Sequence, residues 1–184
     1  AMHRLWAAAL VATAAAFELA SFTYSAGEGL ITLTFDEAVQ SRTLNASGIV
    51  LMSNATAERA PMQRFRLRGA HPTLGQFLYT TPYNTTETLT LVMRDDDLLE
   101  VQALSDLAVD AKSVWLVAEE GLARAVSDND RSAAITKPLE VDTYVPDTLQ
   151  SKMELYTIDM HEGLICFKFL EPVDRSSLDL SGVI

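Results

Sequence analysis

Apolar and polar residues alternate in two segments of the chain, at residues 30–35 and 164–169. Apolar side chains take every second position in both: Ile31, Leu33, Phe35, Ile165, Phe167 and Phe169. A period of two residues is that of a β-strand with one buried face. We therefore expect these side chains to face a core, and a shift of one residue in either strand would expose them.

Short apolar runs between turn residues predict further strands. Gly29 closes a turn after residues 18–25, which predicts a hairpin. Other strands are expected over residues 49–52, 63–68, 76–80, 88–93, 113–118 and 135–143. A short helix is expected over residues 98–102, because Asp95, Asp96 and Asp97 can cap its N–H groups.

Many short strands and one brief helix predict an all-β protein with an Ig-like β-sandwich. The expected core contains Ile31, Leu33, Phe35, Phe65, Leu67, Leu91, Trp115 and either Leu116 or Val117. Trp115 and Phe77 lie in alternating strands, so we expect them in the core rather than on a sugar-binding surface. With 184 residues, of which 48% are apolar, the chain is long enough to bury one full core.

Part of the sequence recurs after 134 residues. Residues 28–50 align with residues 162–184, and ten of the 23 positions are identical. The second copy contains a hairpin pattern without the strands that would cover its apolar face. We therefore expect a sandwich over residues 17–143, a linker over 144–148 and a partial second repeat over 149–184. Self-association would then cover the incomplete repeat.

The first sixteen residues have the pattern of a secretory signal peptide. Arg4 precedes an apolar stretch, and Ala14, Ala15 and Ala16 form a small-residue end where cleavage is expected. The apolar stretch is too short to span a bilayer comfortably. Because Ala1 precedes Met2, the segment is alternatively the end of a preceding unit.

Three sites for N-linked glycans point to the same secretory route. Asn45, Asn54 and Asn84 each begin an N-x-[ST] sequence, and the chain has only one further asparagine. We expect all three in exposed loops of a secreted or cell-surface glycoprotein. Cys166 is the single cysteine, so the chain cannot form an internal disulfide.

The net charge of −11 and the pI near 4.6 narrow the range of partners. Such a surface repels nucleic acid and anionic lipid, so neither nucleic-acid binding nor membrane insertion of the mature module is expected. Solubility or cation binding fits the charge better.

Four sequence segments together resemble a tandem repeat of very large extracellular proteins of marine microbes and protists. They are GLITLTFDEAVQSRTLNASGIVL, MRDDDLLEVQALSDLAV, VSDND and VDTYVPDTL. Similar repeats are the flagellar-system-associated repeats of cyanobacterial swimming proteins and the Ig-like modules of bacterial S-layer proteins. Residues 169–174, FLEPVD, keep the family's strand-end motif, whereas residues 35–40, FDEAVQ, depart from it at Ala38 and Gln40. The resemblance implies stalks, surface layers and adhesins, with neighbouring repeats of the same polypeptide as partners.

The sequence contains few of the residue patterns that catalytic sites use. The chain has three histidines, His3, His71 and His161, with no G-x-S-x-G motif and no H-x-x-x-H pair. Glu37 and Glu171 occupy matching repeat positions, but a carboxylate at a strand end is usually a solvated group. We therefore expect a non-catalytic protein.

Calcium is the ligand that the acidic clusters suggest, because hard cations bind several oxygen ligands. The candidate ligands are Asp128 and Asp130, and Asp142 with Asp147 in the linker, where an ion would stiffen two modules. None of these spacings fits an EF-hand loop, and polar turns account for the same residues.

The sequence thus predicts a structural or adhesive module and leaves two alternatives. One is a carbohydrate- or receptor-binding module that uses loops at one end of the sandwich, which an exposed aromatic pair would favour. The other is an accessory domain of a larger extracellular enzyme. Fold resemblance alone does not establish an activity.

Overall fold

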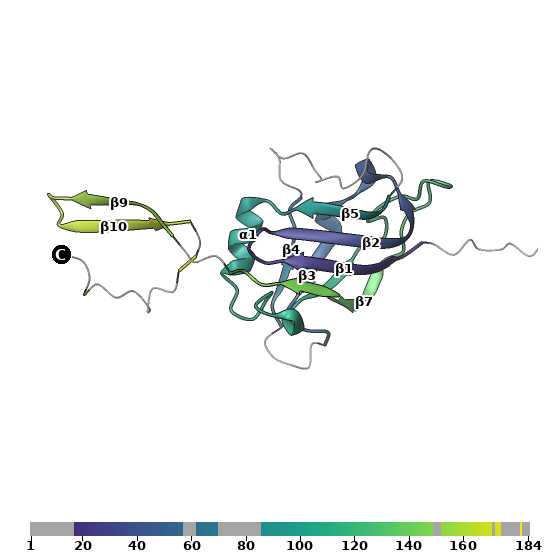
Figure 1. Cartoon of the computed structure of the whole chain (residues 1–184), viewed down its shortest axis with the longest axis horizontal. Helices are drawn as coiled ribbons and strands as arrows, with labels where there is room; N and C mark the ends of the chain where they lie inside the picture. The colour runs from purple at the N-terminus through teal and green to yellow at the C-terminus, as the bar shows by residue number, and fades with distance from the viewer. Residues whose placement is uncertain are drawn as a thin grey trace, which may run out of the picture.

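The computed structural model describes residues 17–56, 62–69, 86–148, 152–170, 172–173 and 181 (Figure 1). This part of the chain is predominantly β and contains one α-helix. Eight of its strands form two four-stranded sheets, and two more form a separate hairpin. The leader expected over residues 1–16 and the strand expected over 76–80 lie outside the described residues.

The first sheet has the strand order β5-β2-β1-β8. Its strands are β1 (Leu19–Ser25), β2 (Leu30–Val39), β5 (Thr86–Val92) and β8 (Thr143–Val145). β1 and β2 form the expected hairpin, and Gly29 in its turn has φ of 62°, a conformation that favours glycine. β8 pairs with β1 in parallel, whereas the other neighbours in this sheet are antiparallel.

The second sheet is antiparallel and has the order β4-β3-β6-β7. Its strands are β3 (Ile49–Met52), β4 (Arg64–Arg66), β6 (Trp115–Ala118) and β7 (Ile135–Glu140). Pro138 lies in β7, and proline is tolerated there because β7 is an edge strand. Three 3₁₀ helices lie in the connections: η1 (Ser41–Thr43), η2 (Ala46–Gly48) and η3 (Ala111–Ser113).

Side chains from both sheets form one hydrophobic core. Its largest fully buried members are Tyr24, Phe22, Phe35, Ile31, Leu33, Ile49, Leu51, Leu67, Leu91, Met93, Leu107 and Leu116. The expected inward face of β2 is therefore confirmed, as are Leu67 and Leu91. Phe65 is partly buried and packs against this core. We call the described residues between 17 and 148 the two-sheet domain.

The prediction that Trp115 lies in the core is wrong. Leu116 is fully buried, so alternation along β6 turns Trp115 and Val117 to the outer face of the second sheet. Trp115 is half-buried there, and its indole N–H donates to the carbonyl of Lys112 at 3.0 Å. Phe77 lies outside the described residues.

The first sheet extends into the segment expected to be a linker. Tyr144 and Val145 belong to β8, so the two-sheet domain continues past the expected boundary at residue 143. The backbone N–H of Ala26 donates to the Val145 carbonyl at 2.9 Å. This parallel pairing joins residues about 120 positions apart, and no local pattern indicates it.

The helix α1 (Asp95–Gln102) confirms the expected helix but not its capping. Arg94 is the N-cap and makes no side-chain capping bond, and the three aspartates lie inside the first turn. Asp97 is fully buried, and its Oδ2 accepts the backbone N–H of Arg68 at 2.8 Å. The buried carboxylate thus ties the helix to the segment after β4. Among the described residues, no helix is both long and apolar enough to cross a membrane.

The second hairpin consists of β9 (Met153–Asp159) and β10 (Leu164–Phe169), and Figure 1 shows it apart from the two-sheet domain. Its six cross-strand pairs match the six pairs of β1 and β2 when 134 is added to each residue number. The pair nearest the turn, Ser25↔Leu30, corresponds to Asp159↔Leu164. The pair farthest from the turn, Leu19↔Phe35, corresponds to Met153↔Phe169. The irregularity in the register also falls at the same place in both hairpins. The two turns share a left-handed glycine, with φ of 65° at Gly163.

The two hairpins differ in what covers them. The face that β1 and β2 bury is partly or largely exposed in the second hairpin, where Tyr156 is 59% and Ile158 is 54% exposed. Cys166 is also exposed. The same pattern of side chains is thus core in one hairpin and surface in the other.

Alanine substitutions at the two turn glycines should distinguish the hairpins. A left-handed conformation costs an L-residue about 1–2 kcal/mol, so Gly29→Ala should lower the free energy of unfolding of the two-sheet domain by at least this amount. A Cβ at Gly29 would also lie 3.1 Å from Leu98 Cδ2, in α1, whereas one at Gly163 would meet nothing within 4 Å. Gly163→Ala should leave the domain's urea transition, followed by circular dichroism, unchanged. Equal losses in both variants would contradict this assignment.

Candidate binding groove on the outer face of the second sheet

The structure does not bring the four candidate calcium ligands together. Asp128 and Asp130 share a turn in which the backbone N–H of Asp130 donates to Asp128 Oδ1 at 3.0 Å. Asp142 precedes β8 and Asp147 follows it, so the strand separates their carboxylates. Within the described ranges, no group of three His, Cys, Asp or Glu side chains could hold a metal ion. Calcium binding stays a prediction that titration calorimetry would test.

Two of the three glycosylation sites lie among the described residues. Asn45 is exposed as the N-cap of η2, and the Ser47 hydroxyl donates to its Oδ1 at 2.7 Å. Asn54 is half-buried in the turn after β3, and its Oδ1 accepts the backbone N–H of Thr56. Asn84 lies outside the described residues. The exposed position of Asn45 makes it the better acceptor of the two.

Expression in a eukaryotic secretory pathway is expected to attach a glycan to Asn45. The amide is at the surface and its sequon serine lies against it, so the local structure does not obstruct the transferase. Mass spectrometry before and after enzymatic deglycosylation should show this glycan in the parent chain. Asn45→Gln and Ser47→Ala should each remove it. An unmodified Asn45 in secreted protein would contradict the expectation.

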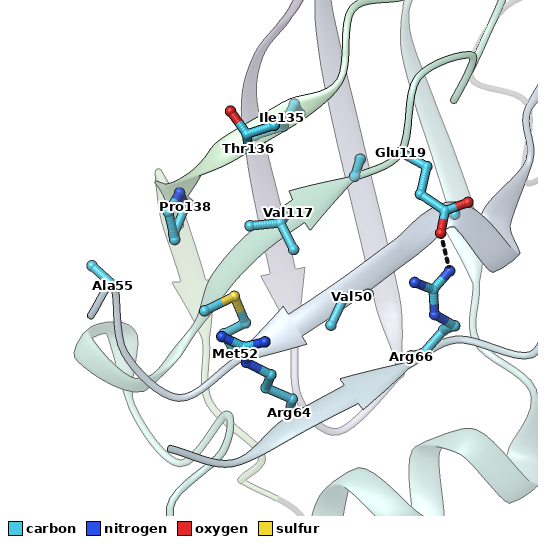
Figure 2. A pocket seen from close by; sticks show the side chains of 12 residues that line it. Val50, Met52, Ala55, Arg64, Arg66, Val117, Glu119, Ile135, Thr136 and Pro138 are labelled. Carbon is cyan, nitrogen blue, oxygen red and sulfur yellow. Dashed lines mark hydrogen bonds and ion pairs between the residues drawn. The ribbon is translucent and has the colours of Figure 1, made fainter. Parts of the chain in front are cut away.

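A groove of about 470 Å³ lies on the outer face of the second sheet (Figure 2). All four strands contribute to it, because residues directly opposite one another on neighbouring strands share a face. One row across the sheet is Arg64, Met52, Trp115 and Glu140, and the next is Arg66, Val50 and Val117. Met52, Val50 and Val117 line the groove and give it an apolar floor, and the two arginines lie along its β4 edge.

The two arginines differ in their partners. Arg66 forms an ion pair with Glu119 at 2.7 Å, and both side chains are more than half exposed. No hydrogen bond or ion pair joins the Arg64 side chain to any other residue that the structure describes. Arg64 lies directly opposite Met52 across β3 and β4, and both side chains line the groove (Figure 2). An exposed cation next to apolar side chains is suited to a ligand with an apolar part and an anionic group.

Aromatic side chains do not gather at this groove. The aromatic residues of the described two-sheet domain are buried or half-buried, and Trp115, which lies opposite Met52 on the outer face, does not line the groove. Sequence reasoning missed the groove, because its residues come together only through the register of four strands. The alternation Arg64-Phe65-Arg66 was the available signal, since it places both arginines on one face.

Comparison of the sequence with family models and with curated proteins, and of the structure with solved structures, finds no match.

Proposed function

We propose that the chain belongs to a non-catalytic tandem-repeat protein, secreted or displayed on a cell surface, in which an Ig-like β-sandwich serves as a structural or adhesive module. Neighbouring repeats of the same polypeptide are its partners. The resemblance to extracellular repeats of marine microbes and protists supports this role. The second hairpin is the observation that carries the proposal.

The strand order supports an Ig-like sandwich. In Ig-like folds the first, second and fifth strands share one sheet, and the third and sixth strands share the other. Here β1, β2 and β5 are neighbours, and β3, β6 and β7 lie together in the second sheet. β4 pairs with β3, as an extra strand does in variable-type domains.

The shared register supports a repeat. Ten of 23 aligned positions are identical in sequence. In addition, the two hairpins share six equivalent cross-strand pairs and the same register irregularity, so their backbone pairing is the same. In the first copy, β5 covers the free edge of β2 and the second sheet covers its apolar face. We infer that β10 takes equivalent partners in a second module.

The path of the chain suits a tandem arrangement. β1 begins at the end of the two-sheet domain opposite to the end from which β8 leads toward β9 (Figure 1). Only residues 146–152 separate β8 from β9. Modules joined in this way follow one another without a long return connection.

An extended chain tests the repeat directly. Val173 corresponds to Val39, so residues 1–173 followed by a second copy of residues 40–148 would supply every strand that a second module needs. We expect the calorimetric unfolding enthalpy to rise roughly in proportion to the number of folded residues, with cooperative melting of both modules. Some core positions of the second module hold a different side chain, such as Phe167 in place of Leu33. The second module should therefore be less stable than the first by about 1–3 kcal/mol.

A matched control is the extended chain with Phe167→Asp. This change places a charge where Leu33 lies in the first core, so the second transition should disappear while the first is retained. The repeat would be refuted if the parent extended chain showed the unfolding enthalpy of one module only.

The groove supports a second candidate function, the binding of an anionic extended partner segment. Arg64 carries this candidate, because it is a cation over an apolar floor and no described residue forms an ion pair with its side chain. A labelled peptide of alternating valine and glutamate should bind, and Arg64→Gln should weaken binding about tenfold. Arg42→Gln, which changes an exposed arginine elsewhere, should leave it unchanged. Equal affinities in fluorescence polarisation for both variants would reject this function.

A further inference from the structure

The first and last strands of the two-sheet domain are parallel neighbours. Three pairs join them: Thr23↔Thr143, Tyr24↔Tyr144 and Ser25↔Val145. Hydrogen bonds close both ends of this ladder, from the backbone N–H of Asp142 to the Phe22 carbonyl and from that of Ala26 to the Val145 carbonyl, each at 2.9 Å. The polypeptide therefore enters and leaves the domain along the same pair of strands.

Parallel pairing fixes the directions in which tension acts. The chain enters β1 at Leu19 and leaves β8 at Val145, and these two positions lie at opposite ends of the pair. Tension along the polypeptide thus pulls the two strands past each other, parallel to their axes. Figure 1 shows the start of β1 at one end of the domain and the chain after β8 leaving from the opposite end.

This geometry loads the cross-strand hydrogen bonds together. Bonds between strands run across the direction of the chain, so sliding one strand along the other strains all of them at once. Tension applied to both strands at one end would instead open the bonds one after another. Resistance to force is set by the unfolding barrier, and the barrier is higher when several bonds must break in the same step.

Side chains also oppose the sliding of β1 past β8. The rings of Tyr24 and Tyr144 stack with centroids 6.3 Å apart, and the Tyr144 hydroxyl donates to the Ala108 carbonyl at 2.9 Å. Tyr24 is fully buried in the core and lies on a strand that also pairs with β2 along its length. β8 is thus held by the loop before η3 as well as by β1.

We propose that the β1–β8 pair is a mechanical clamp, which lets the two-sheet domain carry tension along the polypeptide. The clamp follows from the fold of this domain alone. Its use in an array of modules rests on the proposed function. A structural module of a surface protein would need this property, since its neighbours transmit force through the chain.

Single-molecule pulling on the full chain tests the clamp by changing only the points of attachment. Cys166→Ser removes the exposed thiol in both forms. The first form is held at its two termini, which loads β1 and β8 in shear. The second is held at the C-terminus and at Glu28→Cys, an exposed site in the β1–β2 turn near Ala26, so that β8 is peeled from its Val145 end. At one loading rate we expect a several-fold higher unfolding force for the first form.

Equal forces in the two geometries, or a lower force between the termini, would overturn the clamp. Tyr144→Phe gives an independent reading, because it removes the bond to Ala108 and should lower the force measured between the termini. Tyr156→Phe, at an exposed tyrosine of the second hairpin, should leave that force unchanged; equal effects would also count against the clamp. These results do not depend on the extended chain, so a failed clamp and a failed repeat remain distinguishable.

Discussion

Leu33→Ala is expected to lower the free energy of unfolding of the two-sheet domain by about 2–5 kcal/mol, whereas Phe167→Ala should leave it unchanged. The two residues occupy equivalent positions, opposite Phe22 in β1 and opposite Tyr156 in β9. Leu33 is fully buried, so alanine removes apolar contacts and leaves a cavity. Phe167 is only half-buried in a hairpin whose apolar face is not covered by described residues.

Urea unfolding followed by near-ultraviolet circular dichroism would measure both variants. A loss for Phe167→Ala close to that for Leu33→Ala would show that the second hairpin packs onto the domain. In that case its apolar face would be part of the same core. A small loss for Leu33→Ala would contradict the arrangement of the core itself.

Asp97→Ala is expected to destabilise the domain by about 1–3 kcal/mol, because the backbone N–H of Arg68 loses its acceptor. The carboxylate of Asp97 is fully buried, and its Oδ1 lies 3.7 Å from Arg68 Nη1. Asp96→Ala is the matched control, since its side chain is half exposed and pairs with exposed arginines. Asp96→Ala should lower the free energy of unfolding by less than about 1 kcal/mol. Similar losses in thermal unfolding would show that the buried bond is unimportant.

The same carboxylate should leave a signature in the pH dependence of stability. Burial raises the pKa of Asp97 above its ordinary value of 3.8, although the hydrogen bond from Arg68 opposes this shift. The folded state then holds the proton more tightly than the unfolded state. The contribution of Asp97 is therefore fully present below pH 3.8 and is lost as the pH rises through the folded-state pKa.

Asp97→Asn keeps an acceptor for the Arg68 N–H and removes the charge. Asp96, Arg68 and Arg94 also face this carboxylate, and they stay in both proteins. The stability of the parent relative to Asp97→Asn should thus fall as the pH rises from about 3.8. A difference that is constant with pH, or one that grows, would contradict a raised pKa.

The strands with strong alternation could be predicted from the sequence. The apolar positions of β2 follow from alternation, because one face of that strand is buried, and the bounds of β3 follow from a short apolar run. The prediction for β6 placed neighbouring residues in the core. Adjacent side chains in a strand face opposite ways, so Leu116 excludes Trp115 from the core.

Other features depend on contacts between distant segments. β8 looks like a linker in the sequence and becomes a strand only because β1 offers a parallel partner. Asp95, Asp96 and Asp97 are equivalent in a local pattern, and only the packing of α1 buries Asp97. The candidate groove likewise requires the register of four strands, which no single segment specifies.

Hydrogen exchange at the second hairpin tests the repeat most directly. In the chain of 184 residues, an isolated hairpin is marginally stable, so the backbone amides of β9 and β10 should exchange quickly. In the extended chain, where residues 40–148 follow Val173, the amides of Tyr156 and Phe167 should exchange at least roughly a hundredfold more slowly, since they enter a folded module. Exchange at the same rate in both chains would show that the hairpin is not the start of a second module.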